Sequence, residues 1–140
     1  MTQWDLEAWN ERNRKTIEEF RDNNGNVGGR PILLLTTTGA KSGKRHTTPL
    51  VFLKDGDRWA IFGSKAGNAK HPDWYNNLVA NKIVTVEVGP DAFETDAIVA
   101  DPTERDRLYA IQSQQAPIFA EYQQKTSRRI PVVILAKKSR

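Results

Sequence analysis

Two short turn sequences constrain the fold of this chain more than any other feature. The first is Lys54-Asp55-Gly56-Asp57, and the second is Gly89-Pro90-Asp91. Asp-Gly is a strong signal for a tight β-hairpin, because glycine accepts the positive φ that such turns require. Apolar and β-branched segments flank both turns, so each turn predicts an antiparallel strand pair. The four predicted strands are residues 47–53, 58–63, 83–88 and 93–100.

The remaining segments predict two further strands and four helices. An apolar stripe of Leu6, Trp9, Ile17 and Phe20, with Thr2 as a cap, predicts the first helix. Strand, helix and strand do not alternate regularly, which argues against a Rossmann sheet and for a mainly β, α+β fold, a small antiparallel barrel of about six strands with helices packed on it. The further strands are residues 31–38 and 130–135, and the helices are residues 3–20, 71–78, 101–110 and 115–124.

Length and composition indicate one globular domain. At 140 residues the chain is too short for a two-domain enzyme. Turn-forming residues at 22–29 mark the one candidate boundary, between an N-terminal amphipathic helix at 1–24 and a barrel domain at 25–140. The chain has no cysteine, which excludes disulfides, thiolate metal sites and a cysteine nucleophile. No signal peptide or membrane-spanning run is recognisable, so we expect a cytoplasmic protein.

The densest positive charge lies between the first two predicted strands, in residues 41–46, which we call the basic turn. The whole chain carries 21 Lys and Arg against 17 Asp and Glu, a net charge of +4 at pH 7. Gly39 and Gly43 let the backbone bend so that amide groups and the Ser42 hydroxyl can face an oxyanion, and Lys41, Lys44 and Arg45 supply charge. A phosphate or carboxylate ligand would suit this turn. The alternative is an ordinary solvated hairpin turn. The glycine spacing is not that of a Walker loop.

A second candidate site is the segment of residues 63–70, which we call the glycine loop. Its small residues would let a planar ring approach the backbone, and Ser64 offers a hydroxyl at the end of a strand. A flexible connector is the alternative interpretation. Trp74 follows this loop and is the better candidate for contacting a ligand, whereas the positions of Trp9 and Trp59 predict packing.

Two other kinds of chemistry lack support in the sequence. His46 and His71 are the only histidines and have no recognisable carboxylate spacing, so no metal site is expected. There is also no Gly-x-Ser-x-Gly motif, so nothing favours a hydrolase.

Several segments together resemble the deazaflavin-dependent nitroreductase family, which reduces substrates with coenzyme F420. The resemblance extends over about residues 31–135, and the N-terminal helix is weakly covered. It implies a split β-barrel related to flavin-binding split barrels, in agreement with the hairpin pattern. The segments that carry it are Leu33-Leu34-Leu35-Thr36-Thr37-Thr38-Gly39-Ala40-Lys41-Ser42-Gly43-Lys44, Thr48-Pro49-Leu50, Gly63-Ser64-Lys65-Ala66-Gly67, His71-Pro72-Asp73-Trp74-Tyr75-Asn76-Asn77-Leu78, and Thr126 with Arg129-Ile130-Pro131-Val132-Val133.

The resemblance also implies roles for residues. The basic turn, Lys41, Ser42, Gly43, Lys44, Arg45 and His46, would bind the phosphate and the acidic tail of the coenzyme. The deazaflavin ring would lie near Thr48, Pro49, Ser64, Lys65 and Gly67, with Trp74 closing the pocket. Phe119 and Tyr122 would lie on the substrate side, and Ser64 or Tyr122 would deliver a proton.

This chain departs from the family pattern at two places. Members commonly carry arginine where this chain has His46, a donor whose charge depends on pH. Two tyrosines that line the substrate side of the best-studied activity are replaced by Ala116 and Phe119. Because their hydroxyls are absent, we expect a quinone or an enone to be a better acceptor than a nitroimidazole.

The sequence therefore predicts an F420-dependent reductase that passes a hydride to a quinone, enone or nitro-type acceptor. The alternatives are a non-catalytic coenzyme carrier, an FMN-binding oxidoreductase and a basic nucleic-acid-binding module. The last is disfavoured because no aromatic residue interrupts the basic turn. A small-molecule acceptor is the expected partner, the N-terminal helix is a candidate for peripheral membrane contact, and the sequence leaves the oligomeric state open.

Overall fold

The fold is an antiparallel barrel with helices on its outside, seen here in a computed structural model that describes the backbone of residues 3–138 and the side chains of residues 8–138. The strands are β1 (Ile32–Thr38), β2 (Arg45–Asp55), β3 (Arg58–Phe62), β4 (Ile83–Val88), β5 (Asp91–Asp96), β6 (Ile98–Val99) and β7 (Val132–Ala136). The helices are α1 (Gln3–Asp22), α2 (Asp73–Ala80), α3 (Pro102–Gln115) and α4 (Ile118–Gln124), with a short 3₁₀ turn η1 (Lys65–Gly67). The predicted cap Thr2 lies outside the described residues.

Both predicted hairpins are confirmed. β2 pairs with β3 across Asp55 and Arg58, and β4 pairs with β5 across Val88 and Asp91. All strand pairs are antiparallel, in the order β5-β4-β1-β2-β3-β7-β6. The mainly β, α+β class is therefore confirmed.

The barrel has seven strands instead of the six expected, because the predicted strand at residues 93–100 is divided. Its first part pairs with β4, and its second part, β6, pairs with β7. Between the two parts, the Ala97 amide donates to the Lys82 carbonyl oxygen (2.8 Å). Because β5 and β6 stand at opposite ends of the strand order but are adjacent in the chain, the chain at Ala97 passes from one end of the sheet to the other and nearly closes the barrel.

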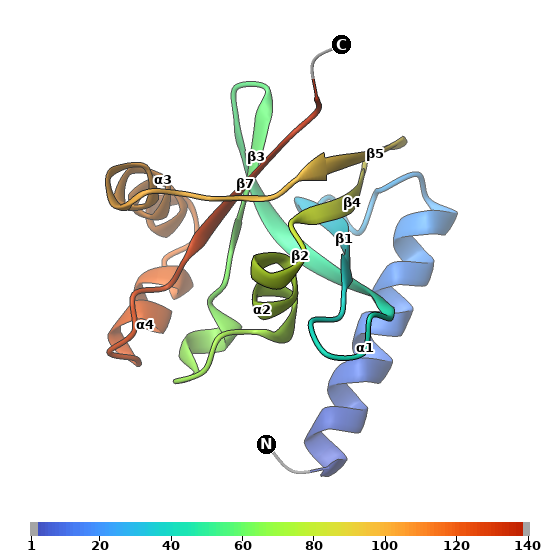
Figure 1. Cartoon of the computed structure of the whole chain (residues 1–140), viewed down its shortest axis with the longest axis horizontal. Helices are drawn as coiled ribbons and strands as arrows, with labels where there is room; N and C mark the ends of the chain where they lie inside the picture. Colours follow the sequence, from blue (N-terminus) through green and yellow to red (C-terminus); the bar gives the residue numbers. More distant parts are fainter. Residues whose placement is uncertain (1–2, 139–140) are drawn as a thin grey trace.

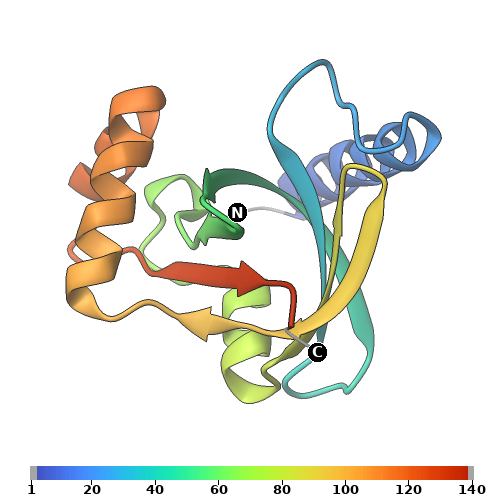
Figure 2. The same cartoon turned by 90° about the horizontal axis from the view of Figure 1, so that it is seen from above.

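Side-chain alternation along the strands separates an inner core, inside the barrel, from two outer cores. One outer core lies under α3 and α4, and the other lies under α1. In β3, Trp59 and Ile61 point into the barrel, whereas Ala60 and Phe62 pack under α3 and α4. In β1, Leu34 faces α1. Figures 1 and 2 show α3 and α4 on one side of the barrel and α1 on the opposite side. Both faces of these strands are buried, which explains the uninterrupted apolar runs at residues 32–35 and 59–62.

All four helices differ from their predicted bounds: α1 ends two residues later, α2 lies two residues further along the chain, and α3 and α4 differ by more. Asp101 caps α3 by accepting from the Glu104 amide (2.8 Å), as expected, but α3 continues to Gln115 instead of stopping at Ala110. α4 then starts at Ile118, after Pro117. The division into units at residues 1–24 and 25–140 stays a prediction.

Trp9 contradicts the expectation that it packs. Its side chain is 47 % exposed and lies beside the guanidinium of Arg12, whereas Phe20 on the same helix is buried against β1. The reason is that the N-terminal half of α1 extends beyond the barrel, where no strand covers the helix (Figure 1).

Candidate coenzyme site

The basic turn is a compact loop closed by its own backbone. The Gly39 amide donates to the Lys44 carbonyl oxygen (2.7 Å), and the Gly43 amide donates to the Gly39 carbonyl oxygen (3.0 Å). The Ser42 hydroxyl oxygen accepts from the Lys44 amide (3.1 Å). A Cβ at position 39 would lie 2.5 Å from the Ser42 Oγ, so the Ser42 side chain would have to move to admit a larger residue there. Arg45 and His46 belong to β2, where they pair with Thr38 and Thr37.

Asn77, to which the sequence analysis assigned no role, anchors the basic turn to α2. Its side-chain oxygen accepts from the Ala40 amide (3.0 Å), and its side-chain nitrogen donates to the hydroxyl of the buried Thr37 (3.4 Å). The signal in the sequence was a polar residue inside a predicted amphipathic helix, one residue before the predicted end. A polar residue at such a position predicts a particular contact only when the loop that packs against the helix is known.

The cations of the basic turn are free to bind an anion. Lys41, Lys44 and Arg45 are exposed, and Arg45 donates to the Thr85 hydroxyl (2.7 Å). Among the side chains that the structure describes, no carboxylate forms an ion pair with these three residues. His46 is also exposed and its ring lies close to Gly39. Because no carboxylate of the described residues neutralises these cations, they can form ion pairs with an acidic ligand.

The glycine loop adopts a strained backbone. Three successive residues, Lys65, Ala66 and Gly67, have positive φ values of 44°, 53° and 78°. The Gly67 amide donates to the Ser64 carbonyl oxygen (2.9 Å). Positive φ is costly for residues with a side chain and is often found at functional sites. The Ser64 side chain is half-buried and makes no capping hydrogen bond.

Arg128, another residue that the sequence analysis missed, binds the glycine loop from the segment before β7. Its guanidinium donates to the carbonyl oxygens of Gly63 (3.0 Å), Ser64 (2.8 Å) and Asn68 (2.9 Å). Neighbouring residues of the segment were recognised in the sequence, but their spacing gave no sign that this arginine reaches back some sixty residues along the chain.

His71 completes this cluster. Its Nδ1 lies 3.1 Å from the Arg128 guanidinium, so Nδ1 acts as the acceptor, and its ring packs on Tyr75. Burial, together with the charge of Arg128, lowers the pKa of His71. Burial also lowers the pKa of Arg128. His71 is therefore kept as a neutral partner of Arg128.

β2 offers a partly open surface between these two loops. It lies between β1 and β3, yet residues 46–52 are all half-buried or exposed. Thr48 is paired with Leu35 of the inner core, and Pro49 is paired with Leu34 of the outer core. Because neighbouring strand residues point to opposite faces, only one of these two side chains can face a given ligand.

The predicted substrate-side residues lie on α4, next to the glycine loop. A side chain at Gly67 would collide with the Tyr122 carbonyl oxygen, so loop and helix are in direct contact. Tyr122 is half-buried, with its ring edge-on to Phe119 at 5.4 Å. Phe119 is only 9 % exposed, and its carbonyl oxygen accepts from the Tyr109 hydroxyl (2.5 Å). The structure thus brings Tyr122 and the glycine loop together.

Trp74 is placed differently from the expectation. Its side chain is 6 % exposed and packs in the inner core with Leu78, so its ring does not lie open beside the loop. Trp59 is a core residue, as expected.

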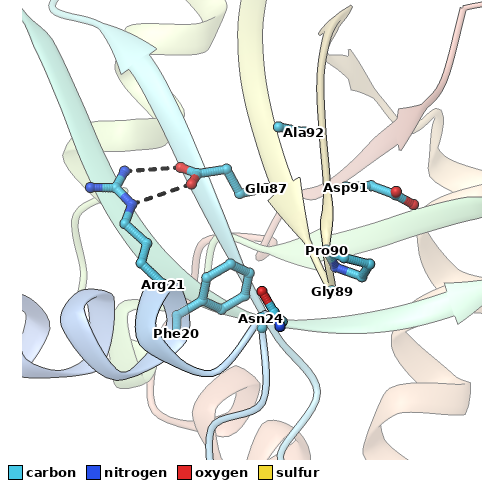
Figure 3. A pocket seen from close by; sticks show the side chains of 9 residues that line it. Phe20, Arg21, Asn24, Glu87, Gly89, Pro90, Asp91 and Ala92 are labelled. Atoms are coloured by element: carbon cyan, nitrogen blue, oxygen red, sulfur yellow. Dashed lines mark hydrogen bonds and ion pairs between the residues drawn. The ribbon is translucent and has the colours of Figure 1, made fainter.

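Two hollows among the described residues lie away from these loops. One, of about 150 Å³, separates the end of α1 from the β4–β5 turn, where Arg21 and Glu87 form a bidentate ion pair (Figure 3). The other, of about 450 Å³, lies beside β6 and the start of α3. Neither is lined by a residue of the basic turn or the glycine loop.

The arrangement can hold an elongated anionic molecule. The basic turn contacts α2 at Asn77, and the glycine loop precedes the N-terminal end of this eight-residue helix, so the two loops lie at different levels along a helix about 12 Å long. The basic turn offers unpaired cations to one end of such a molecule, and the glycine loop offers backbone and hydroxyl groups to the other end. The donor set suits a cofactor with an acidic tail and a planar ring, and the fold and site define a coenzyme-binding split barrel.

Comparison with known proteins identifies the family. Residues 12–137 match the model of the F420H(2)-dependent quinone reductase family. An F420H(2)-dependent quinone reductase of Mycobacterium tuberculosis strain H37Rv is 39 % identical, over 96 % of this chain and 99 % of the relative. This chain belongs to the F420H(2)-dependent quinone reductase family, and it is therefore an oxidoreductase that depends on coenzyme F420.

Solved structures agree with this assignment. An F420-H2 dependent reductase is 42 % identical and superposes with a TM-score of 0.68, over 75 % of this chain and 93 % of that chain. A second structure, described as a domain-swapped dimer, is 38 % identical with a TM-score of 0.69, over 86 % of this chain and 94 % of that one. The haem storage protein HutZ of Vibrio cholerae, 14 % identical with a TM-score of 0.59 over 89 % of each chain, shares the fold alone.

The described residues contain neither a helix suited to span a membrane nor a cluster suited to bind a metal ion. Within residues 3–138, no helix combines the length and the apolar character needed to cross a membrane. In the same part of the chain, no cluster of three or more His, Asp or Glu residues is arranged to hold a metal ion.

Proposed function

We propose that this protein transfers a hydride from reduced F420 to a quinone, and that the basic turn holds the acidic end of the coenzyme. The observation that carries this proposal is the set of exposed, unpaired cations at Lys41, Lys44 and Arg45. The names of the relatives support quinone as the acceptor. The side chains of Ser42 and His46 supply further donors at the same turn, and Gly43, whose amide already donates to the Gly39 carbonyl oxygen, supplies the positive φ of 70° at the bend.

The ring of the coenzyme would lie between the basic turn and the glycine loop. The half-exposed surface of β2 at Thr48 and Pro49 supports this placement, with one of these residues contributing its side chain and the other its backbone. Ser64, Lys65 and Gly67 would bound the ring from the glycine loop. Trp74 would form the floor beneath the ring, since its side chain belongs to the inner core.

The acceptor would stack on the exposed face of the ring, beside α4. Tyr122 supports this side because it is half-buried and touches the glycine loop through its backbone. Phe119 lies behind Tyr122 and fixes its ring through an edge-to-face contact. An apolar wall of this kind suits a quinone better than a nitro group, which needs hydrogen-bond donors.

When bound, reduced F420 supplies a hydride, and the protein supplies orientation, a shielded face and a proton. The hydride and the proton together convert a quinone into a hydroquinone, a two-electron reduction. The Ser64 or Tyr122 hydroxyl, directly or through water, would donate the proton. No covalent bond to the protein forms.

A peripheral membrane contact through α1 stays a prediction. The helix carries more acidic than basic residues, which disfavours an anionic surface, and Trp9 is the exposed aromatic residue that such a contact would use.

Binding of the coenzyme tests the proposal. Titration should show F420 binding and no comparable binding of FMN, which lacks the acidic tail. Lys41→Ala should raise the Kd of F420 several-fold at low salt and less at high salt, because salt screens exposed charges. Lys137→Ala is the matched control, since it removes the same charge beyond the far end of β2. Tighter binding of FMN than of F420, or equal effects of the two substitutions, would contradict the proposal.

A further inference from the structure

The glycine loop has a backbone conformation that costs free energy at two residues. Lys65 and Ala66 both have side chains and both have positive φ. Their short-range support is two backbone hydrogen bonds, from Gly67 to Ser64 and from Asn68 to Lys65. A strained backbone persists only where surrounding groups favour it over the relaxed alternatives.

Arg128 provides this support from outside the loop. Its three nitrogens donate to three loop carbonyl oxygens, at positions 63, 64 and 68, so it bridges the start and the end of the strained segment. The planar guanidinium presents its donors in a fixed geometry, which a lysine cannot reproduce.

Arg128 is occupied by neutral partners only. Its contacts are the three carbonyl oxygens and the His71 ring. Among the described side chains, no carboxylate forms an ion pair with it. A half-buried arginine without a counter-ion is unusual, because desolvation of its charge is not offset by an opposite charge. In this structure, the cost of burying the Arg128 charge is offset by its hydrogen bonds to the loop carbonyl oxygens.

We propose that Arg128 is a positioning residue, which holds the glycine loop in the left-handed conformation that presents Ser64 and the loop backbone to the coenzyme. This inference rests on the proposed function, because it assumes that the coenzyme binds at the glycine loop. It assigns a role in coenzyme affinity to a residue that lies behind the loop, on the connection between α4 and β7.

Amide hydrogen exchange and coenzyme titration of Arg128→Gln and Arg128→Lys test this inference. We expect the Gly67 amide to exchange about tenfold faster or more in both variants, because charged hydrogen bonds to the loop are lost. The Kd of F420 should rise by a similar factor. Arg30→Gln is the control, since Arg30 also donates to a backbone carbonyl oxygen, that of Val27, but does not touch the loop. It should leave both readouts unchanged.

Ala66 offers an independent test that leaves Arg128 in place. Ala66→Gly removes strain at an exposed position, so in the Arg128→Gln background it should restore part of the protection and of the affinity. Ala66→Val should weaken both in the parent protein, because β-branched residues disfavour positive φ. This second variant serves if Arg128→Gln does not fold.

The outcomes separate this inference from the proposed function. If the parent does not bind F420, the proposed function fails, whereas the exchange data still report on the loop. If the parent binds F420 and Arg128→Gln binds it equally well, the inference is overturned, whether or not the Gly67 amide exchanges faster. Unchanged exchange in Arg128→Gln would overturn it as well.

Discussion

At the residue scale, the two candidate proton donors are distinguished by their surroundings. Ser64 belongs to the strained glycine loop, whereas Tyr122 belongs to α4 and is packed against Phe119. Both belong to segments that touch at Gly67, so both stay candidates for the proposed proton donor.

Conservative substitutions separate the two residues. If Tyr122 donates the proton, Tyr122→Phe should lower kcat for quinone reduction about 10²-fold or more, with little change in the Kd of F420, because the ring and its packing remain. Ser64→Ala should then raise the Kd of F420 modestly and leave kcat nearly unchanged. The opposite pattern would assign the proton to Ser64. Steady-state kinetics and coenzyme titration of both variants distinguish these patterns. If both variants keep the kcat of the parent protein, neither side chain donates the proton.

At the element scale, α1 is attached to the barrel mainly by its C-terminal end. Phe20 packs in the outer core, and Arg21 forms a bidentate ion pair with Glu87 of β4 (Figure 3). Just after the helix, Gly25 lies directly on Gly89 in the β4–β5 turn. A Cβ at position 25 would lie 2.5 Å from the Gly89 Cα. The docking of α1 therefore depends on a close approach of two backbones.

Gly25→Ala tests this docking. It should destabilise the protein by about 2–4 kcal/mol, because it combines strain at a φ of +89° with a collision against backbone. Gly28→Ala is the matched control, since its φ is +60° and nothing lies within 4 Å of its added Cβ. It should cost only about 1–2 kcal/mol. Urea denaturation measures both, and equal losses would show that the Gly25–Gly89 contact can relax.

At the scale of the whole molecule, a charge network joins a barrel hairpin to α3. Arg58 and Arg107 each form ion pairs with both Asp55 and Glu104. Hydrogen bonds from Arg107 and then from Arg58 lower the pKa of Glu104 from 4.5 to about 2. The same two arginines lower the pKa of Asp55.

These shifts predict how stability depends on pH. Because the pKa of Glu104 is lower in the folded state, its contribution to stability is complete above pH 4.5 and is lost as pH falls towards 2. Glu104→Gln should therefore flatten the fall of stability over this interval, and leave the slope above pH 5 unchanged. Thermal unfolding from pH 2 to 7 tests this, with Glu94→Gln as a control at an exposed β5 position. Parallel curves for parent and Glu104→Gln would contradict it.

The sequence by itself determined the local structure and the chemistry of the basic turn. The Asp-Gly pair at residues 55–56 specified a hairpin, because the required positive φ is a property of the residue at the turn. Asp101 specified the start of α3 in the same way, through a hydrogen bond within one turn. The charge of residues 41–46 is likewise visible in the sequence, and the resemblance supplied the coenzyme that the comparisons confirm.

Only the tertiary structure decided which elements cover which face and which distant residues support the site. The run Leu33-Leu34-Leu35 shows that both faces of β1 are buried, but not that α1 covers one of them. The sequence also does not show that the chain passes from one end of the sheet to the other at Ala97. Nor does it show that Trp9 lies on the part of α1 that extends beyond the barrel. Asn77 and Arg128 act through contacts with loops far away in the chain. Spacing along a sequence encodes local geometry, whereas these contacts depend on how the whole chain packs.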